Sequence, residues 1–189
     1  HPAAVSMIVV GNEVLLRREL ATRALAALIA DVRERSGVPV AYADVAHFIR
    51  QNPEVAAAAD ILLIHLLPYW DDPAPPPVEE AVAGVMDGYD EFRAQFPGKA
   101  VMIGETGWPS RGRVRGPGHP GLVEEARFVR GSAAAAAARG IRYNLIEAVD
   151  QPWKRRPEGT VGGYWGLLDE DRALKFPLQG PVSAHPGWR

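Results

Sequence analysis

The chain has 189 residues, 47% of them hydrophobic, and a formal net charge of −2 at pH 7. This length and hydrophobic content suit one folded domain with a buried core and exclude an intrinsically disordered chain. The slightly negative charge argues against a nucleic-acid or anionic-membrane surface, and the absence of cysteine excludes disulfide bonds and thiolate metal sites.

Five short apolar runs predict strands that are buried on both faces, because the runs are nearly continuous and do not alternate with polar residues. We expect strands at residues 5–10, 38–43, 61–66, 100–103 and 141–146. Longer segments between them have helical spacing, and two glycines mark helix ends. We expect helices at residues 18–36, 53–59, 78–96 and 124–139, with Gly37 and Gly140 as stops. This alternation predicts right-handed crossovers and a parallel α/β sheet.

Two parallel architectures compete for this order of elements. An open doubly wound sheet usually carries a glycine-rich phosphate loop after its first strand, whereas GNEVLLR at residues 11–17 has a single glycine. In a (β/α)8 TIM barrel, functional polar residues stand at the ends of several strands. Polar or aromatic residues do end all five runs here, namely Asn12, Glu13, Tyr42, Asp44, His65, Tyr69, Glu105, Trp108, Glu147 and Asp150. We therefore predict a TIM barrel.

Two glutamates at strand ends are the strongest candidates for catalysis. If both strands belong to one barrel, Glu13 and Glu105 emerge on the same rim. Paired carboxyl groups at a cleft suit glycoside cleavage, in which one gives a proton to the leaving oxygen and the other attacks the anomeric carbon or activates water. A single strand-end glutamate is more often a salt-bridge or helix-cap partner. Two of them, each set among glycine with asparagine or tryptophan, favour catalysis.

These segments also resemble a known family. VVGNEV at residues 9–14, together with IGETGWPS at 103–110, resembles glycoside hydrolase family 17, the β-1,3-glucanases and β-1,3-glucanosyltransferases, with the character of its bacterial members. The similarity continues through HLLPYW, NLIEAVDQPWK and GGYWGLLDEDRALKFP and covers nearly the whole chain. It implies a β-glucan oligosaccharide or polysaccharide as substrate, no cofactor and no nucleic acid. It also implies a periplasmic or membrane-associated location in a bacterium.

The resemblance assigns roles by strand order. The family belongs to a clan of retaining (β/α)8 enzymes with the acid/base after strand four and the nucleophile after strand seven. Glu13 then corresponds to the acid/base, Glu105 to the nucleophile, Asn12 to a ligand of the sugar 2-hydroxyl and Tyr69 to a donor that orients Glu105. Residues 1–189 would form a single partial barrel with strands four to eight. We expect strands one to three, and any link to a membrane, to lie in parts of the protein outside this sequence.

Several further residues are weaker candidates for substrate binding. Three tryptophans either stack on sugar rings or pack in the core, and we prefer Trp153 as a sugar platform because its neighbours are polar. The other two are Trp108 and Trp165. 

Three charged residues near the last strand either bind sugar hydroxyls or form an ion-pair network: Glu147, Asp150 and Lys154. His65 either supports the site or is a buried structural histidine. No segment has metal-ligand spacing.

The sequence therefore favours a retaining enzyme that acts on β-1,3-glucan by hydrolysis or by transglycosylation. A non-catalytic glucan-binding or scaffold module derived from the same barrel is the alternative. A clan member acting on a β-1,4 or mixed-linkage glucan is a third interpretation.

Overall fold

The computed structural model of the chain describes residues 4–70 and 74–180, which form two compact units. The first unit comprises residues up to Leu66 together with Tyr89–Glu105, and the second comprises Leu67–Gly88 together with the residues from Thr106 onward. The strands follow the order β1-β2-β3-β4-β5 in the sheet. Because neighbouring strands in the first unit are also consecutive and parallel, the predicted parallel α/β organisation is confirmed.

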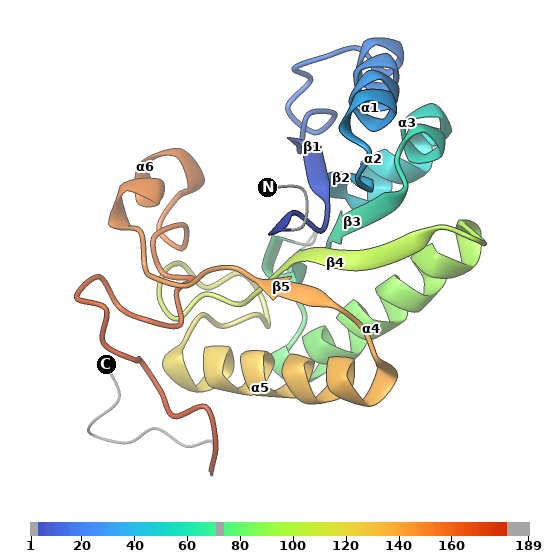
Figure 1. Ribbon diagram of the computed structural model, residues 1–189. Coiled ribbons are helices and arrows are strands. Elements are labelled where there is room, and N and C mark those ends of the chain that lie inside the picture. Colours follow the sequence, from blue (N-terminus) through green and yellow to red (C-terminus); the bar gives the residue numbers. More distant parts are fainter. Residues whose placement is uncertain (1–3, 71–73, 181–189) are drawn as a thin grey trace. The chain divides into compact units, whose positions relative to one another are not determined.

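The first unit contains four strands and the helices that connect the first three (Figure 1). Its elements are β1 (Ile8–Asn12), α1 (Thr22–Ser36), β2 (Val40–Val45), α2 (Ala46–Gln51), α3 (Pro53–Ala58), β3 (Ile61–His65), the C-terminal part of α4 (Val78–Gln95) and β4 (Ala100–Thr106). In the parallel register, Ile8 lies opposite Val40 and Ala41 opposite Ile61. The next pairing sets Ile61 opposite Ala100.

Both faces of this sheet are apolar, as the uninterrupted hydrophobic runs predict. One face gathers alternate residues of three strands into a cluster, namely Ala41, Ala43, Ile61, Leu63 and Met102. On the helical side, α1 and α2 pack on β2, and α1 lies beside α3 (Figure 1). Leu25 and Ile29 of α1 are fully buried there. The carboxyl ends of the parallel strands therefore reach one edge, where polar side chains are free to gather.

The helix after β1 begins later than its composition predicts. Residues 13–18 form a turn, and Arg18 has a left-handed backbone with φ of 56°. Because that conformation cannot continue an α-helix, α1 starts at Thr22. The predicted stop is confirmed, since Gly37 caps α1 in the left-handed conformation with φ of 65°. The short helix α2 is not predicted from the sequence pattern.

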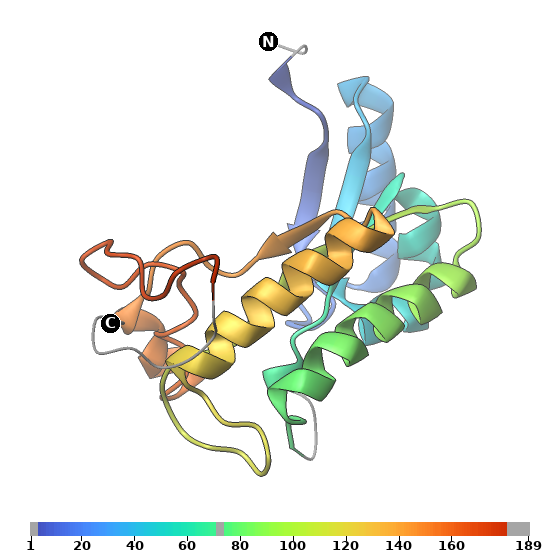
Figure 2. The same ribbon diagram turned by 90° about the horizontal axis from the view of Figure 1, so that it is seen from below.

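The second unit is built around α5 (Leu122–Arg139) and β5 (Tyr143–Leu145). It also holds η2 (Pro68–Trp70), the N-terminal part of α4, η3 (Pro152–Lys154) and α6 (Arg155–Glu158). After β5, Ile146 N donates to Thr106 O at 2.9 Å. Figure 2 shows the loop after Thr106 and the segment after β5 gathered at the N-terminal end of α5. Within the described ranges, no helix combines the length and apolarity needed to cross a membrane.

Candidate active site

The backbone at the end of β1 is shaped to present Glu13. Gly11 has φ of 88°, and a Cβ there would lie 2.8 Å from Val14 Cγ2, so the position requires glycine. The strand register shifts between Val9 and Asn12, and Glu13 itself adopts φ of 56°. A positive φ at a residue other than glycine is uncommon and is often found at functional sites. The sequence GNE is therefore a strand end that turns sharply at its glutamate.

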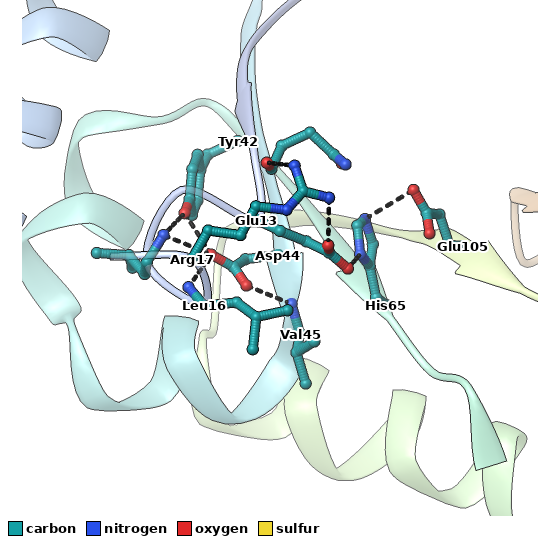
Figure 3. Close-up of polar contacts among 10 residues, drawn as sticks. Glu13, Leu16, Arg17, Tyr42, Asp44, Val45, His65 and Glu105 are labelled. Carbon is teal, nitrogen blue, oxygen red and sulfur yellow. Dashed lines mark hydrogen bonds and ion pairs between the residues drawn. The ribbon is translucent and has the colours of Figure 1, made fainter. Parts of the chain in front are cut away.

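Asp44 of β2 holds the turn that follows Glu13 (Figure 3). Its Oδ2 atom accepts the backbone N–H groups of Leu15 at 3.1 Å and Leu16 at 3.4 Å. The Tyr42 hydroxyl donates to the same oxygen, and Val45 N donates to Oδ1 at 2.8 Å. Both Asp44 and Tyr42 are fully buried, and burial, together with the Asp44 carboxylate, raises the pKa of the Tyr42 hydroxyl. This network fixes the turn and, with it, the direction of Glu13.

His65, the last residue of β3, lies between the two candidate glutamates (Figure 3). Its Nδ1 atom is 3.0 Å from Glu13 Oε1, and its Nε2 atom is 3.7 Å from Glu105 Oε1. The imidazole side chain is 1% exposed, whereas Glu13 and Glu105 are 14% and 27% exposed. The fold thus brings together two carboxyl groups that are far apart in the sequence, as predicted, and separates them by one buried ring.

The glycine of IGET makes room for this ring. A Cβ at Gly104 would lie 2.9 Å from His65 Cδ2 and 3.0 Å from Leu63 Cβ. Both distances are too short for packed carbon atoms, so a side chain here would displace His65 or the strand. Gly104 therefore sets how closely β4 approaches the imidazole.

Electrostatics at Glu13 favour the carboxylate form. The hydrogen bond with His65 lowers the pKa of Glu13 most, partial burial opposes this, and the charges of His65 and Arg17 lower it further. Arg17 Nη2 donates to Glu13 Oε2 at 2.8 Å. A glutamate that donates a proton works best with a raised pKa. The lowered pKa of Glu13 is thus the opposite of what an isolated acid catalyst requires.

The same three residues also have the side-chain types of metal ligands. One donor atom each of Glu13, His65 and Glu105 lies within 4.8 Å of the others. However, His65 faces Glu13 with Nδ1 and Glu105 with Nε2. The ring as placed therefore lies between the two carboxyl groups, with one nitrogen toward each.

The structure changes the interpretation of two of the three tryptophans. Trp108 is 1% exposed, its Nε1 atom donates to His119 O at 2.9 Å, and its ring stacks on Phe128. Trp165 is 3% exposed and stacks on Trp70. Sugar stacking by Trp108 or Trp165 is therefore wrong for the described structure, because protein atoms already cover their faces.

Two other tryptophans of the second unit remain accessible. Trp153 is 67% exposed, and its predicted role as a sugar platform stays a prediction. Trp70, which was not among the predicted binding residues, is 40% exposed and stacks on Trp165 with ring centroids 5.8 Å apart. The only available signal for Trp70 was its place in HLLPYW, directly after a predicted strand-end residue.

The charged residues after β5 belong to two separate groups, one ion pair and one cluster of three residues. Lys154 Nζ lies 2.6 Å from Glu147 Oε2, as the ion-pair interpretation predicts. Asp150 is instead buried, and its Oδ1 atom is 3.0 Å from Lys175 Nζ, which also lies 3.0 Å from Glu125 Oε2. Asp150 also accepts the N–H of Gly166. This buried carboxylate holds the C-terminal segment and is not placed to bind a sugar; its predicted binding role is corrected.

The structure does not decide the roles of two further predicted residues. Asn12 is exposed at the end of β1, and its carbonyl accepts from Arg17 at 3.4 Å. The Tyr69 hydroxyl donates to Arg113 O within the second unit. The proposed bond from Tyr69 to Glu105 stays a prediction. Arg17 was missed because the helix predicted from residue 18 concealed the turn that folds it back onto Glu13.

The chain is similar to several known proteins. The family described as the BtgE/BtgC glycoside hydrolase domain matches residues 1–166. A glucan 1,3-beta-glucosidase of Candida albicans is 26% identical over 93% of this chain and 63% of its own length. A probable glucan endo-1,3-beta-glucosidase, btgC of Aspergillus clavatus, is 28% identical over 92% of this chain and 28% of its own length.

Solved structures support the same relationship. The glycoside hydrolase family 17 beta-1,3-glucanosyltransferase of Rhizomucor miehei superposes with a TM-score of 0.81 and 30% identity, over 90% of this chain and 62% of that one. An active-site mutant of that enzyme in complex with laminaritriose is similar at 29% identity, with the same TM-score and coverage. The chain thus spans less than two thirds of these relatives. From the match over most of its length, the chain belongs to the BtgE/BtgC glycoside hydrolase domain family, which confirms the resemblance seen in its sequence.

Proposed function

We propose that the protein is a retaining glycosidase that cleaves β-1,3-glucan, with Glu105 as nucleophile and Glu13 as acid/base. The observation that carries the proposal is the approach of the two carboxyl groups, which have one oxygen each within 4.8 Å. Carboxyl groups of retaining glycosidases are about 5–5.5 Å apart, whereas inverting enzymes need roughly 6.5–9.5 Å to admit a water molecule. The shorter separation favours direct attack by a carboxylate.

In the first step, the Glu105 carboxylate attacks the anomeric carbon and displaces the leaving oxygen, which takes a proton from Glu13. A covalent bond then joins Glu105 to the sugar, and Glu13 is a carboxylate. The rim residue Asn12 is placed beside Glu13 in sequence and is our candidate to bind the sugar 2-hydroxyl, a contact that strengthens at the transition state.

In the second step, Glu13 removes a proton from the incoming acceptor, whose oxygen attacks the anomeric carbon and releases Glu105. Water as acceptor gives hydrolysis, and a sugar hydroxyl gives transglycosylation. The relatives include proteins named as glucosidases and one named as a glucanosyltransferase, so both outcomes belong to the proposal.

The five strands are proposed to be strands four to eight of a TIM barrel, since the chain covers 62% of the similar transferase. The substrate is proposed to be a laminari-oligosaccharide or longer β-1,3-glucan, because a similar enzyme is described in complex with laminaritriose. A periplasmic or membrane-associated location is proposed from the sequence resemblance.

The two carboxyl roles can be tested by separate substitutions in the full-length protein. Glu105→Ala is expected to abolish turnover of laminari-oligosaccharides. Glu13→Ala is expected to lose activity on natural substrate, but to release a good aryl leaving group and to form a β-glycosyl azide when azide is added, because azide needs no general base. Glu91→Ala, at an exposed position of α4, is the matched control and should leave turnover unchanged. Full activity of Glu105→Ala would refute the proposal.

A non-catalytic glucan-binding module is the competing function. It predicts that wild-type protein is retained on insoluble β-1,3-glucan without releasing reducing sugar, whereas the proposed enzyme releases sugar over time.

A further inference from the structure

The position of His65 suggests how a glutamate with a lowered pKa can still act as a proton donor. The ring is nearly inaccessible to water, and its Nδ1 atom is 3.0 Å from Glu13 Oε1. This distance lies within the reach over which a proton can pass from one group to the other.

We propose that His65 is a positioning residue that shares the catalytic proton of Glu13 and, through its second nitrogen, keeps Glu105 ionised. This inference rests on the proposed roles of the two glutamates. The proposed cycle starts with a proton on each nitrogen of His65 and with both glutamates as carboxylates. Before cleavage, the Nδ1–H bond breaks as an O–H bond forms on Glu13, which gives neutral His65 and a protonated acid. The Nε2–H group remains directed at Glu105.

The reverse transfer follows in the second half of the reaction. Glu13 takes a proton from the acceptor and returns it to Nδ1 of neutral His65, so the number of protons in the site is restored after each cycle. The ring also opposes the reversed assignment of roles. A proton on Glu105 would leave the Nε2–H group facing a neutral carboxyl at 3.7 Å, which is a weaker interaction than with a carboxylate.

Charged groups of neighbouring elements lie around the ring. Glu13 faces it from β1 and Glu105 from β4, while Arg17 in the turn binds the far oxygen of Glu13. Asp44 of β2 is directed at the backbone N–H groups of that turn and of Val45. Two carboxyl groups thus flank the ring, and one guanidinium group lies on the far side of Glu13.

The proposal predicts a specific pH profile. When two groups share a proton, the alkaline limb of kcat/KM reports the loss of that proton from the pair and not from glutamate alone. Without the imidazole only the carboxyl group can hold this proton, and carboxyl groups lose protons at lower pH than imidazole groups, so the limb should move to lower pH. A ring that only packs against Glu13 would lower the rate without moving the limb.

The test compares His65→Gln, which keeps hydrogen-bonding capacity but cannot be protonated, with His47→Gln, an exposed position on α2. The full-length protein is assayed with laminari-oligosaccharide from acidic to alkaline pH, after its thermal unfolding confirms that the variant is folded. We expect the alkaline limb of His65→Gln to shift to lower pH and that of His47→Gln to stay in place. A reduced rate with an unmoved limb would overturn the proposal.

A second measurement needs no substitution at His65. The protein is labelled with ¹⁵N-histidine and studied by NMR. In the resting wild type, both Nδ1 and Nε2 of His65 should be protonated. In Glu13→Gln, Nδ1 alone should be unprotonated, because residue 13 no longer offers a carboxylate to it. Unprotonated Nε2 in the resting enzyme would contradict the assignment. Azide rescue of Glu13→Ala tests the underlying glutamate roles separately, so failure of the histidine proposal is distinguishable from failure of the proposed function.

Discussion

Arg17 Nη2 lies 2.8 Å from Glu13 Oε2, and the two residues stand at opposite ends of one turn, in which Arg17 N donates to Glu13 O at 2.9 Å. The cation is 52% exposed, so water and salt screen its effect on the carboxyl group. The pair nevertheless places a positive charge directly on the proposed acid/base.

We predict that Arg17→Met moves the alkaline limb of kcat/KM to higher pH. Arg17 lowers the pKa of Glu13, so its removal lets the proposed acid keep its proton longer. Exposed ion pairs are worth about 0.2–1 kcal/mol, which corresponds to a few tenths of a pH unit. The pH profile should be measured at low and high salt, because salt should shrink the difference. Arg35→Met removes an exposed ion pair on α1 and should leave the profile unchanged. A shift of the limb to lower pH in Arg17→Met would contradict this account.

We predict that Gly104→Ala impairs catalysis, whereas Gly84→Ala does not. The added methyl carbon at residue 104 would overlap with atoms of His65 and Leu63, because its shortest contact would be 2.9 Å. Position 84 in α4 has open space, and alanine there should stabilise the helix by about 0.5–1 kcal/mol. Both variants should be compared by kcat/KM and by urea unfolding. Equal kcat/KM of the two variants would show that the packing of β4 on His65 does not affect catalysis.

We predict that Trp153→Ala weakens substrate binding and that Trp108→Ala weakens folding. Trp153 is 67% exposed and is free to stack on a sugar, a contact worth roughly 1 kcal/mol, or about fivefold in KM. Trp108 is fully buried, so its truncation should cost about 3–5 kcal/mol of unfolding free energy. KM for laminari-oligosaccharides and the urea midpoint distinguish these effects. Unchanged KM in Trp153→Ala would remove this residue from the binding site.

We predict that the stability of the protein falls as pH rises from about 4.5 toward 8, and that Glu125→Gln reduces this dependence. Burial raises the pKa of Glu125 to about 8, with Lys175 opposing the shift. Between these pH values the folded state keeps a proton that the unfolded chain has lost, so the unfolded state binds fewer protons and stability decreases with pH.

Urea unfolding of wild type and Glu125→Gln at several pH values measures this effect, with the exposed Glu34→Gln as control. The wild-type and Glu34→Gln midpoints should decline in parallel, while that of Glu125→Gln stays flatter. An identical decline in all three proteins would mean that Glu125 does not hold the proton that the folded state keeps.

The strand ends were predictable because they combine two local signals, an apolar run and an abrupt polar stop. This was sufficient to find Glu13 and Glu105 and to expect them at one edge of a parallel sheet. The late start of α1 was not predictable, because it depends on Asp44, a buried carboxylate from another strand that accepts the turn's N–H groups. Local helix propensity contains no information about such a partner.

The burial of individual aromatic residues was likewise not predictable from the sequence. Trp108 and Trp153 both follow strand-end motifs, yet one is 1% and the other 67% exposed. The difference arises from long-range packing, since Trp108 stacks on Phe128 of α5. The bridging position of His65 also depends on three strands meeting at one point. Sequence identified the chemical groups, and tertiary packing decided which of them are accessible.

The most direct test of the central claim is the anomeric configuration of the first product, measured by ¹H NMR within the first minutes of laminari-oligosaccharide hydrolysis by the full-length protein. Two successive displacements at the anomeric carbon, by Glu105 and then by water, predict that the new reducing end appears first as the β-anomer. Initial appearance of the α-anomer would mean a single displacement, and would contradict the assignment of Glu105 as nucleophile.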